Sequence, residues 1–213
     1  MKLRDFQVIG FDLDGTIIDS IDGIYDSYRY SATKINLKVF GKKFIASKIG
    51  PQIDIFFMNL YPNNLELLNE YINHFRLYYL KKGYKKTKIK NGVLSLLKIL
   101  YSNSHELFIL TNKSGESTNL ILNELGISKY FSKIISINKN DKHLGNKSSN
   151  IRFLTKDYKK SVYIGDTIED LDACIQAGIN FIGLEDGYGV FDEINKTETI
   201  QFCKSAENVV ELY

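Results

Sequence analysis

Near its start the chain reads Val8-Ile9-Gly10-Phe11-Asp12-Leu13-Asp14-Gly15-Thr16. The apolar run 8–11 predicts a buried strand, and two carboxylates follow it two positions apart. Side chains at i and i+2 of an extended segment project to the same side, so Asp12 and Asp14 are expected to converge where the strand ends and Gly15 lets the chain turn away. Two like charges this close need a cation, a hydrogen bond or a shared proton to relieve their repulsion. For a bare Asp-x-Asp, an acidic loop without function is the simpler alternative.

The composition of the chain limits the classes of protein to which it can belong. The chain has 213 residues, 44% of them hydrophobic, which is ample for a real core. No run approaches the roughly 20 apolar residues that span a bilayer, and residues 1–5 resemble no signal peptide, so we expect a cytoplasmic protein. A net charge of +3 is too small to imply binding to nucleic acid or membrane. Cys174 and Cys203 lie in apolar helical patterns and are expected to be buried thiols.

Between about residues 20 and 85 the hydrophobic period is helical. Apolar residues recur at three- and four-residue steps, which is the pattern of an amphipathic helix. The sets are Ile21, Ile24, Tyr25, Tyr28, Ala32 and Ile35, then Ile53, Phe56, Phe57 and Leu60, then Leu65, Leu68, Tyr71, Ile72, Phe75, Tyr78 and Tyr79. We expect a small all-helical unit without strands. The basic run 81–90 predicts a solvated linker, with an RNA or membrane contact as the alternative.

From Asn91 onward the pattern alternates between helix and strand. Strands are expected at 106–111, 134–137, 161–165 and 180–184, with helices between them. Short apolar strands alternating with helices predict an α/β fold with a Rossmann-like parallel sheet covered on both faces. Ligands of such sheets bind beyond the carboxyl ends of the strands. The helical block enters just after the first strand, so we expect a core domain of residues 1–18 and 88–213 and a helical cap domain of residues 19–87 that acts as a lid.

Three further segments of the predicted core carry polar residues that could contribute to a site. Thr111 and Asn112 end the strand at 106–111, Lys147 opens a helix, and Asp166 and Asp170 follow the strand at 161–165. If that last helix begins near Asp166, the two carboxylates stack on one face. Each feature has an ordinary explanation as well: Thr-Asn is a common helix N-cap, and acidic residues favour a first helical turn.

The lysine of this set is open to alternatives. Lone lysines are nearly always solvated at the surface. Lys139 and Lys142 lie close to Lys147 in the sequence and compete with it for the same role.

Taken together, in this order, these features resemble the four-motif pattern of the haloacid dehalogenase superfamily. The resemblance covers nearly the whole chain and is closest to the branch of phosphoglycolate phosphatases and 5′-nucleotidases. The segments that carry it are Asp19-Ser20, Ile49-Gly50-Pro51, residues 79–83, Asn91-Gly92-Val93 and Gly187-Tyr188-Gly189. The chain departs from the family at Asn91, where Pro is usual, and at Ser148, where Pro commonly follows the lysine.

The chemistry that these residue types suit is phosphoryl transfer. A phosphate monoester is anionic, so an attacking carboxylate is repelled unless cations are present. Carboxylates at Asp12, Asp14, Asp166 and Asp170 form an oxygen-only set suited to Mg²⁺. Lys147 is expected to neutralise a phosphate oxygen, and Thr111 and Asn112 to hydrogen-bond the phosphoryl group.

The resemblance assigns roles to these residues. It implies that Asp12 is the nucleophile that forms an aspartyl-phosphate intermediate and that Asp14 is the general acid and then the general base. It implies Mg²⁺ bound by Asp12, the backbone carbonyl of Asp14, and Asp166, with Asp170 acting directly or through water. An acid at position 14 favours phosphate esters over carbon–halogen or carbon–phosphorus bonds.

We therefore expect a Mg²⁺-dependent phosphatase acting on a small phosphorylated metabolite, phosphoglycolate-like or nucleotide-like, as a monomer or homodimer. The alternatives are a phosphomutase resembling β-phosphoglucomutase and a non-catalytic regulator that binds a protein or a phosphorylated ligand. Substrate choice is expected to come from the cap, where Lys42 and Lys43 either contact a substrate anion or are solvated.

Overall fold

A computed structural model describes residues 1–137, 145–191 and 194–213. Its centre is a sheet in which six described strands run parallel in the order β5-β4-β1-β6-β7-β8. The strands are β1 (Val8–Phe11), β4 (Glu106–Thr111), β5 (Lys133–Ser136), β6 (Ser161–Gly165), β7 (Asn180–Leu184) and β8 (Ile200–Cys203). The predicted Rossmann-like parallel sheet is confirmed.

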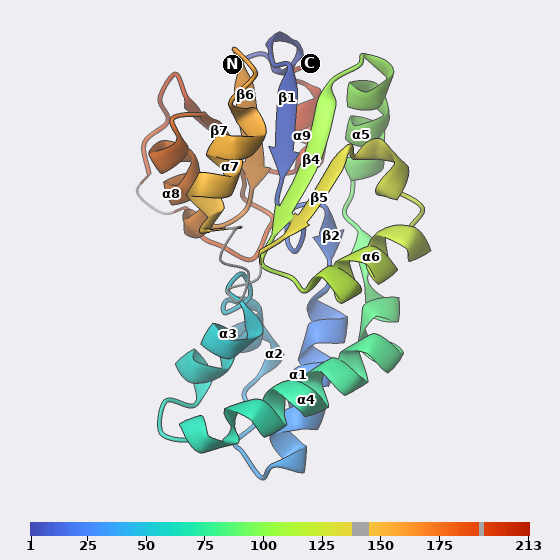
Figure 1. The fold of residues 1–213 in the computed structure, drawn as a ribbon, viewed down its shortest axis with the longest axis vertical. Helices are drawn as coiled ribbons and strands as arrows, with labels where there is room; N and C mark the ends of the chain where they lie inside the picture. The colour runs from blue at the N-terminus through green and yellow to red at the C-terminus, as the bar shows by residue number, and fades with distance from the viewer. Residues whose placement is uncertain (138–144, 192–193) are drawn as a thin grey trace.

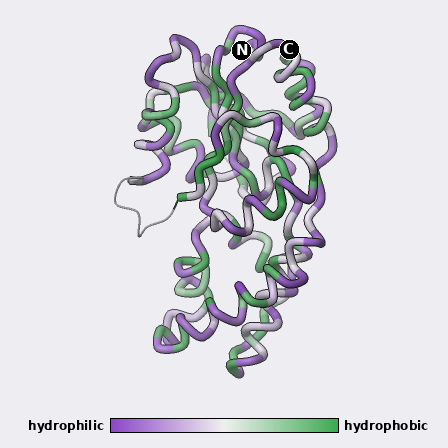
Figure 2. The backbone as a smooth tube through the Cα atoms, turned by 45° about the vertical axis from the view of Figure 1, so that its right-hand side comes forward, coloured by the Kyte–Doolittle hydropathy of each residue, from purple (hydrophilic) through white to green (hydrophobic). Residues whose placement is uncertain are grey.

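Helices cover both faces of the sheet (Figure 1). One face packs against α5 (Val93–Ser102), α6 (Gly115–Glu124) and α9 (Ala206–Val210), and the other against α7 (Lys147–Thr155) and α8 (Ile168–Ala177). Successive strand residues alternate between the two layers: Ile9 packs into the first and Val8 into the second. Figure 2 shows the hydrophobic stretches gathered along these central strands. Burial on both faces explains why the strands are continuous apolar runs in the sequence.

The helical unit follows β1 and lies beyond the carboxyl ends of the strands, at the opposite end of the molecule from the two termini (Figure 1). It consists of α1 (Ile21–Lys34), α2 (Lys42–Ala46), α3 (Ile53–Leu60), α4 (Leu68–Tyr78) and a π-helical turn at Tyr79–Gly83. Its own core is largely aromatic, with Tyr28, Phe57 and Tyr71 fully buried. It is helical throughout the described residues 21–86, apart from its connecting segments.

A two-stranded antiparallel ribbon joins the helical unit to the sheet. The chain leaves the sheet through β2 (Ile18–Asp19) and returns through β3 (Lys88–Ile89). The ribbon falls at the two positions where the sequence suggests a domain boundary. The division into a core domain and a cap domain stays a prediction.

One sequence expectation about the C-terminal region is wrong. Cys203 does not lie in a helix: it is the last residue of β8, paired with Leu184 of β7. Four residues are too few to distinguish helical from strand periodicity, and the parallel pairing with β7 decides the conformation. Both cysteines are buried free thiols, as expected.

None of the described helices combines the length and the apolar character that crossing a membrane requires.

Candidate active site

Neighbouring parallel strands bring the predicted residues to one edge of the sheet. Asp12 directly follows β1, and its backbone N–H donates to the carbonyl of Ile164 in β6 at 2.9 Å. Asp166 directly follows β6, and Thr111 ends β4 on the other side of β1. The three positions therefore meet at the carboxyl edge, where parallel α/β sheets bind ligands.

Three carboxylates converge there. Asp12, Asp166 and Asp170 each offer an oxygen within 4.8 Å of the other two. Asp166 and Asp170 are completely buried, and Asp12 is 7% exposed. Burial raises the pKa of Asp12 well above its usual value; Lys147 opposes this, while the charges of Asp170 and Asp166 add to it. Burial, together with the charge of Asp170, raises the pKa of Asp166 to about 6. Three carboxylates this close repel one another, and a cation would offset that repulsion.

Lys147 supplies one such cation. It is the first residue of α7, which Asn146 caps by accepting from the backbone N–H of Ser149 at 2.9 Å. Its Nζ lies 2.8 Å from Asp12 Oδ1 and 2.5 Å from Asp170 Oδ1. Burial lowers the pKa of Lys147, but the two carboxylates outweigh this and leave the pKa well above its usual value. Its competitors Lys139 and Lys142 lie outside the described residues.

Asp166 and Asp170 meet through a turn rather than along a helix. The expectation of a helix beginning near Asp166 is wrong, because α8 begins at Ile168 with Thr167 as its N-cap. The cap is reciprocal: Thr167 Oγ1 accepts from the Asp170 N–H at 3.2 Å, and Asp170 Oδ2 accepts from the Thr167 N–H at 3.0 Å. Capping occupies Oδ2 of Asp170 and leaves Oδ1 facing Lys147.

Asp166 is held by two loops that approach it closely. Thr16 Oγ1 donates to its Oδ1 at 2.8 Å, and the backbone N–H of Tyr188 donates to its Oδ2 at 2.7 Å. A Cβ on Gly15, whose φ is +88°, would lie 2.1 Å from Asp166 Oδ2, and a Cβ on Gly187 would lie 2.1 Å from Asp166 Cβ. Only glycine allows both loops to pack against this carboxylate.

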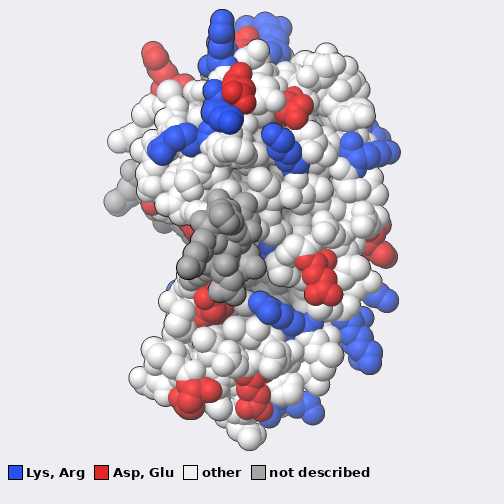
Figure 3. All heavy atoms as spheres, in the orientation of Figure 1, with Lys and Arg blue, Asp and Glu red and all other residues white. Residues whose placement is uncertain are grey.

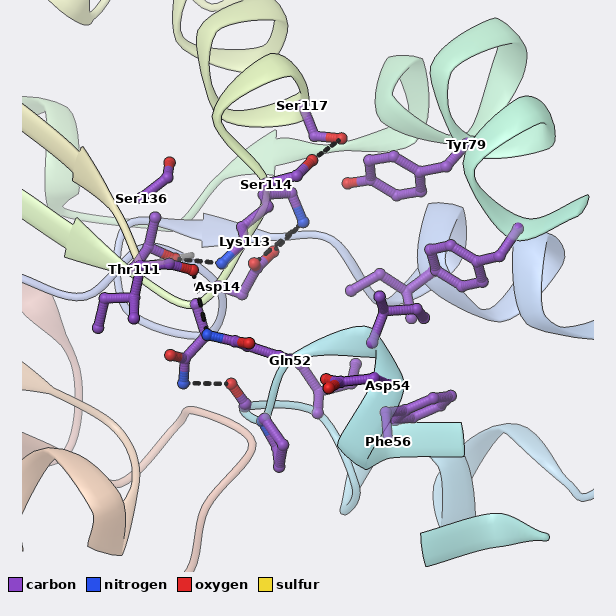
Figure 4. Close-up of a pocket in the computed structure, with 18 of the residues that line it drawn as sticks. Asp14, Gln52, Asp54, Phe56, Tyr79, Thr111, Lys113, Ser114, Ser117 and Ser136 are labelled. Atoms are coloured by element: carbon purple, nitrogen blue, oxygen red, sulfur yellow. Dashed lines mark hydrogen bonds and ion pairs between the residues drawn. The ribbon is translucent and has the colours of Figure 1, made fainter. Parts of the chain in front are cut away.

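The side chain of Asp14 lies apart from the carboxylate cluster and has a lysine of its own. Lys113 Nζ donates to Asp14 Oδ1 at 2.9 Å and to Oδ2 at 3.0 Å (Figure 4). Ser20 Oγ donates to Asp14 Oδ1 at 2.5 Å. Asp12 and Asp14 thus both line the same cavity, but each is paired with a different cation.

Thr111 and Asn112 both line the cavity, although their hydrogen bonds are to protein groups. The buried Thr111 hydroxyl accepts from the backbone N–H of Lys113 at 3.2 Å. Asn112 Nδ2 donates to the carbonyl of Gly50 at 2.9 Å and to the Glu169 carboxylate at 3.2 Å, which ties a loop of the helical unit to the sheet. Their predicted role in binding substrate stays a prediction.

A cavity of about 630 Å³ separates the sheet edge from the helical unit. The sheet side contributes Asp12, Asp14, Thr111 and Lys113. The opposite wall is mostly apolar and aromatic, and it also carries the polar side chains of Gln52, Asp54 and Arg76; its apolar members are Ile24, Ile49, Ile53, Phe56, Ile72, Phe75 and Tyr79. Lys42 and Lys43 are not among the lining residues; Lys42 pairs with Asp22 and is about half exposed. On the face shown in Figure 3, charges of both signs are interspersed.

Sequence reasoning missed several residues of the site. Lys113 pairs with Asp14 across 99 positions, and Tyr188 bonds to Ser20 across 168. Lys90, expected in a solvated linker, is 9% exposed and donates to the carbonyl of Gly15 and to Asp186. The sequence offered weak local signals for them: Lys113 follows Asn112, Lys90 precedes Asn91, and Tyr188 lies within the segment Gly187-Tyr188-Gly189 that carries the resemblance.

The donor set of the carboxylate cluster fits Mg²⁺. Its three side chains offer only oxygen, the ligand that hard cations prefer. Asp170 Oδ1 is buried and makes no regular hydrogen bond among the described residues, although Lys147 lies beside it. Three carboxylates face one lysine, and a divalent cation would balance that charge.

Comparison with known proteins agrees with this geometry. The pattern of the haloacid dehalogenase-like hydrolases matches residues 9–184. The chain is 26% identical over 197 residues to a 5′-nucleotidase of Pseudomonas aeruginosa (91% of this chain, 89% of the relative). It is 26% identical to a phosphoglycolate phosphatase of Yersinia pestis (91% and 87%) and 28% identical to the tyrosine-protein kinase PtkA of Mycobacterium tuberculosis (91% and 67%). A crystal structure of a "predicted phosphatase" from Clostridium acetobutylicum superposes with a TM-score of 0.83 at 26% identity, covering 97% of this chain and 99% of that one.

Proposed function

The chain belongs to the haloacid dehalogenase-like hydrolases, and we propose that it is a Mg²⁺-dependent phosphatase that hydrolyses a small phosphomonoester through a phosphorylated Asp12. One observation carries the proposal. Asp12 lines the cavity at the sheet edge, 2.8 Å from the buried Lys147 and within the carboxylate cluster. The names of the phosphatase relatives support the same class of reaction.

In the first half-reaction the Asp12 carboxylate attacks phosphorus. A bond forms between an Asp12 carboxylate oxygen and phosphorus, and the bond from phosphorus to the alcohol oxygen breaks. Asp14 donates its proton to that oxygen, so the leaving group departs as a neutral alcohol. Lys147, beside Asp12, neutralises negative charge on the transferring group.

In the second half-reaction water attacks the phosphorus of the phosphorylated Asp12. The bond between the Asp12 oxygen and phosphorus breaks, which releases inorganic phosphate and restores the carboxylate. Asp14 takes the proton that the water loses, so both carboxyl groups return to their starting states.

Asp12, Asp166 and Asp170, with the backbone carbonyl of Asp14, are the residues that would hold the metal. When bound, Mg²⁺ supplies positive charge that offsets the phosphoryl oxygens and the carboxylates. Lys90 and Tyr188 steady the loops on which these residues lie, by donating to Gly15 and to Asp166 respectively.

The wall opposite the sheet supports a phosphoglycolate-like or nucleotide-like substrate rather than a macromolecule. A cavity of about 630 Å³ is within the range of sites for small molecules. The wall opposite the sheet offers apolar surface to the leaving group, and Arg76 offers a cation to an anionic or polar one.

The test is phosphate release from p-nitrophenyl phosphate and from a panel that includes phosphoglycolate, nucleoside monophosphates, pyrophosphate and sugar phosphates. Turnover with Mg²⁺ that EDTA abolishes, and that Asp12→Asn abolishes, supports the proposal. Silence of the folded wild type across the panel would overturn it. Conversion of a sugar phosphate in the presence of a bisphosphate, with little free phosphate, would support a phosphomutase instead. Binding of a phosphorylated ligand without turnover would support a regulator.

A further inference from the structure

The site contains a second buried lysine that the reaction described above does not use. Lys113 and Asp14 expose only 8% and 13% of their side chains. Lys113 Nζ is within 3.0 Å of both carboxylate oxygens of Asp14, so the pair is bidentate (Figure 4). A carboxylate bonded through both oxygens has its plane fixed as well as its position.

Lys113 is itself held from two sides. The Thr111 hydroxyl accepts from its backbone N–H at 3.2 Å, which secures the turn between β4 and α6. On the side of the helical unit, the ring centroid of Tyr79 lies 4.7 Å from Nζ. Tyr79 is 2% exposed and stacks on Phe75 with the ring centroids 5.8 Å apart. Burial lowers the pKa of Lys113, but the Asp14 carboxylate more than compensates and raises it above the usual value, so the lysine stays charged.

The two lysines of the site divide the carboxylates between them. Lys147 contacts Asp12 and Asp170, whereas Lys113 contacts Asp14. Neither lysine is paired with the other's carboxylate among the contacts of the described residues. Lys113 is therefore placed to act on the group that transfers protons and not on the nucleophile.

Proton transfer depends on where the Asp14 carboxyl group is held. Asp14 lies in the loop after β1, beside Gly15 with its positive φ, and no regular secondary structure fixes its side chain. A general acid must come within hydrogen-bond distance of the leaving oxygen, and a misplacement of about 1 Å costs on the order of 100-fold in rate. Ser20 holds one oxygen of Asp14, whereas Lys113 holds both.

We propose that Lys113 is a positioning residue. It contacts Thr111 of the sheet and Tyr79 of the helical unit, and it holds the Asp14 carboxyl group where that group can protonate the leaving alcohol. This inference rests on the proposed function, because it assumes that Asp14 is the general acid. Lys113 contacts Asp14 and acts through it.

Substrates with different leaving groups distinguish a positioning role of Lys113 from a merely structural one. An alkyl alcohol must be protonated as it departs, whereas p-nitrophenolate leaves readily without a proton. The value of kcat/KM covers the steps up to departure of the alcohol, so it reports this difference even if release of phosphate from Asp12 limits kcat. We therefore compare kcat/KM for an alkyl phosphate and for p-nitrophenyl phosphate in Lys113→Met and the wild type, both with Mg²⁺.

We expect Lys113→Met to lose about 100-fold in kcat/KM with the alkyl phosphate and less than about 5-fold with p-nitrophenyl phosphate. Lys113→Arg, which keeps a bidentate cation, should recover most of the loss with the alkyl phosphate. Lys42→Met removes an exposed ion pair to Asp22, and neither residue lines the cavity. This variant should leave kcat/KM unchanged for both substrates.

Equal losses with both substrates, or no loss with either, would overturn the inference while leaving the proposed function intact. If Lys113→Met does not fold, Lys113→Gln replaces it, because glutamine keeps much of the bulk and one hydrogen bond, and the same selective loss is expected. A wild type that hydrolyses neither ester would refute the proposed function instead.

Discussion

The two walls of the cavity are built differently. The sheet wall is charged and internally bonded: Asp12, Asp14 and Lys113 line it, and their charged partners are buried. The helical wall is apolar and aromatic, with Arg76 and Asp54 as its charged members. We infer that the sheet wall performs the chemistry and that the helical wall selects the substrate.

The difference follows from how each wall is made. Parallel strands end together, so the polar residues after each strand are brought to one edge. Helix α4 presents Ile72, Phe75 and Arg76 to the cavity, and the π-helical turn that continues it adds Tyr79; these are the i, i+3, i+4 and i+7 positions that share one helical face. One helical face therefore gives a surface that is mostly apolar, whereas several strand ends that meet place different charged and polar groups close together.

The largest expected effect is at the nucleophile. Asp12→Asn should lower kcat by at least about 10⁴-fold with every substrate, because an amide cannot form the phosphorylated intermediate. Phosphate release measures the loss, and the melting temperature shows whether the variant is folded. A folded Asp12→Asn enzyme that keeps 1% of wild-type activity would refute the assignment of the sheet wall.

Lys147→Met should destabilise the protein more than the removal of an exposed lysine of the helical unit. It leaves Asp12 and Asp170 buried without their cation, and removing one partner of a buried pair costs about 3–5 kcal/mol of the free energy of unfolding. Denaturant titration in EDTA measures this. Lys42→Met, which breaks an ion pair between half-exposed side chains, should cost less than about 1 kcal/mol. Equal costs for the two variants would show that Lys147 does not stabilise the carboxylate cluster.

The charge of the metal-free sheet wall should make stability depend on pH. The pKa of Asp166 is about 6 in the folded protein, against 3.8 for an ordinary aspartate. The folded state therefore holds the Asp166 proton more tightly, and the contribution of Asp166 to stability falls as pH rises from about 4 to about 6 and is level above that. At about 1.4 kcal/mol per pKa unit, Asp166 accounts for roughly 3 kcal/mol.

The difference in the free energy of unfolding between the wild type and Asp166→Asn, measured in EDTA at a series of pH values, isolates this contribution. The wild type should lose stability relative to the variant over that interval. A difference that is flat with pH would contradict the raised pKa.

The smallest effect is expected on the helical wall. Arg76→Ala should raise KM by about 3- to 10-fold and change kcat by less than about 2-fold, because a residue that binds substrate and transition state equally affects KM alone. Arg29→Ala is the control: this exposed arginine pairs with Asp26 and does not line the cavity. A fall in kcat without a change in KM would place chemistry on the helical wall too.

Regular elements were predictable wherever the pattern was continuous. The expected strands 106–111, 161–165 and 180–184 coincide with β4, β6 and β7, because strands buried on both faces leave unbroken apolar runs. Short elements were not predictable: β8 has four residues and α2 has five, too few to show a period. The start of α8 was misplaced by two residues, because the reciprocal cap between Thr167 and Asp170 decides it.

The sequence by itself determined the order of helices and strands and the residue types at each strand end, because both depend on local hydrophobic periodicity and on neighbouring residues. It also identified the segments that carry the family resemblance. Tertiary structure alone decided which charges pair: Lys147 with Asp12 and Lys113 with Asp14, across 135 and 99 positions. The physical reason is that burial and Coulomb attraction act through space, so the partner of a buried charge depends on which strand ends and helix starts the fold brings together.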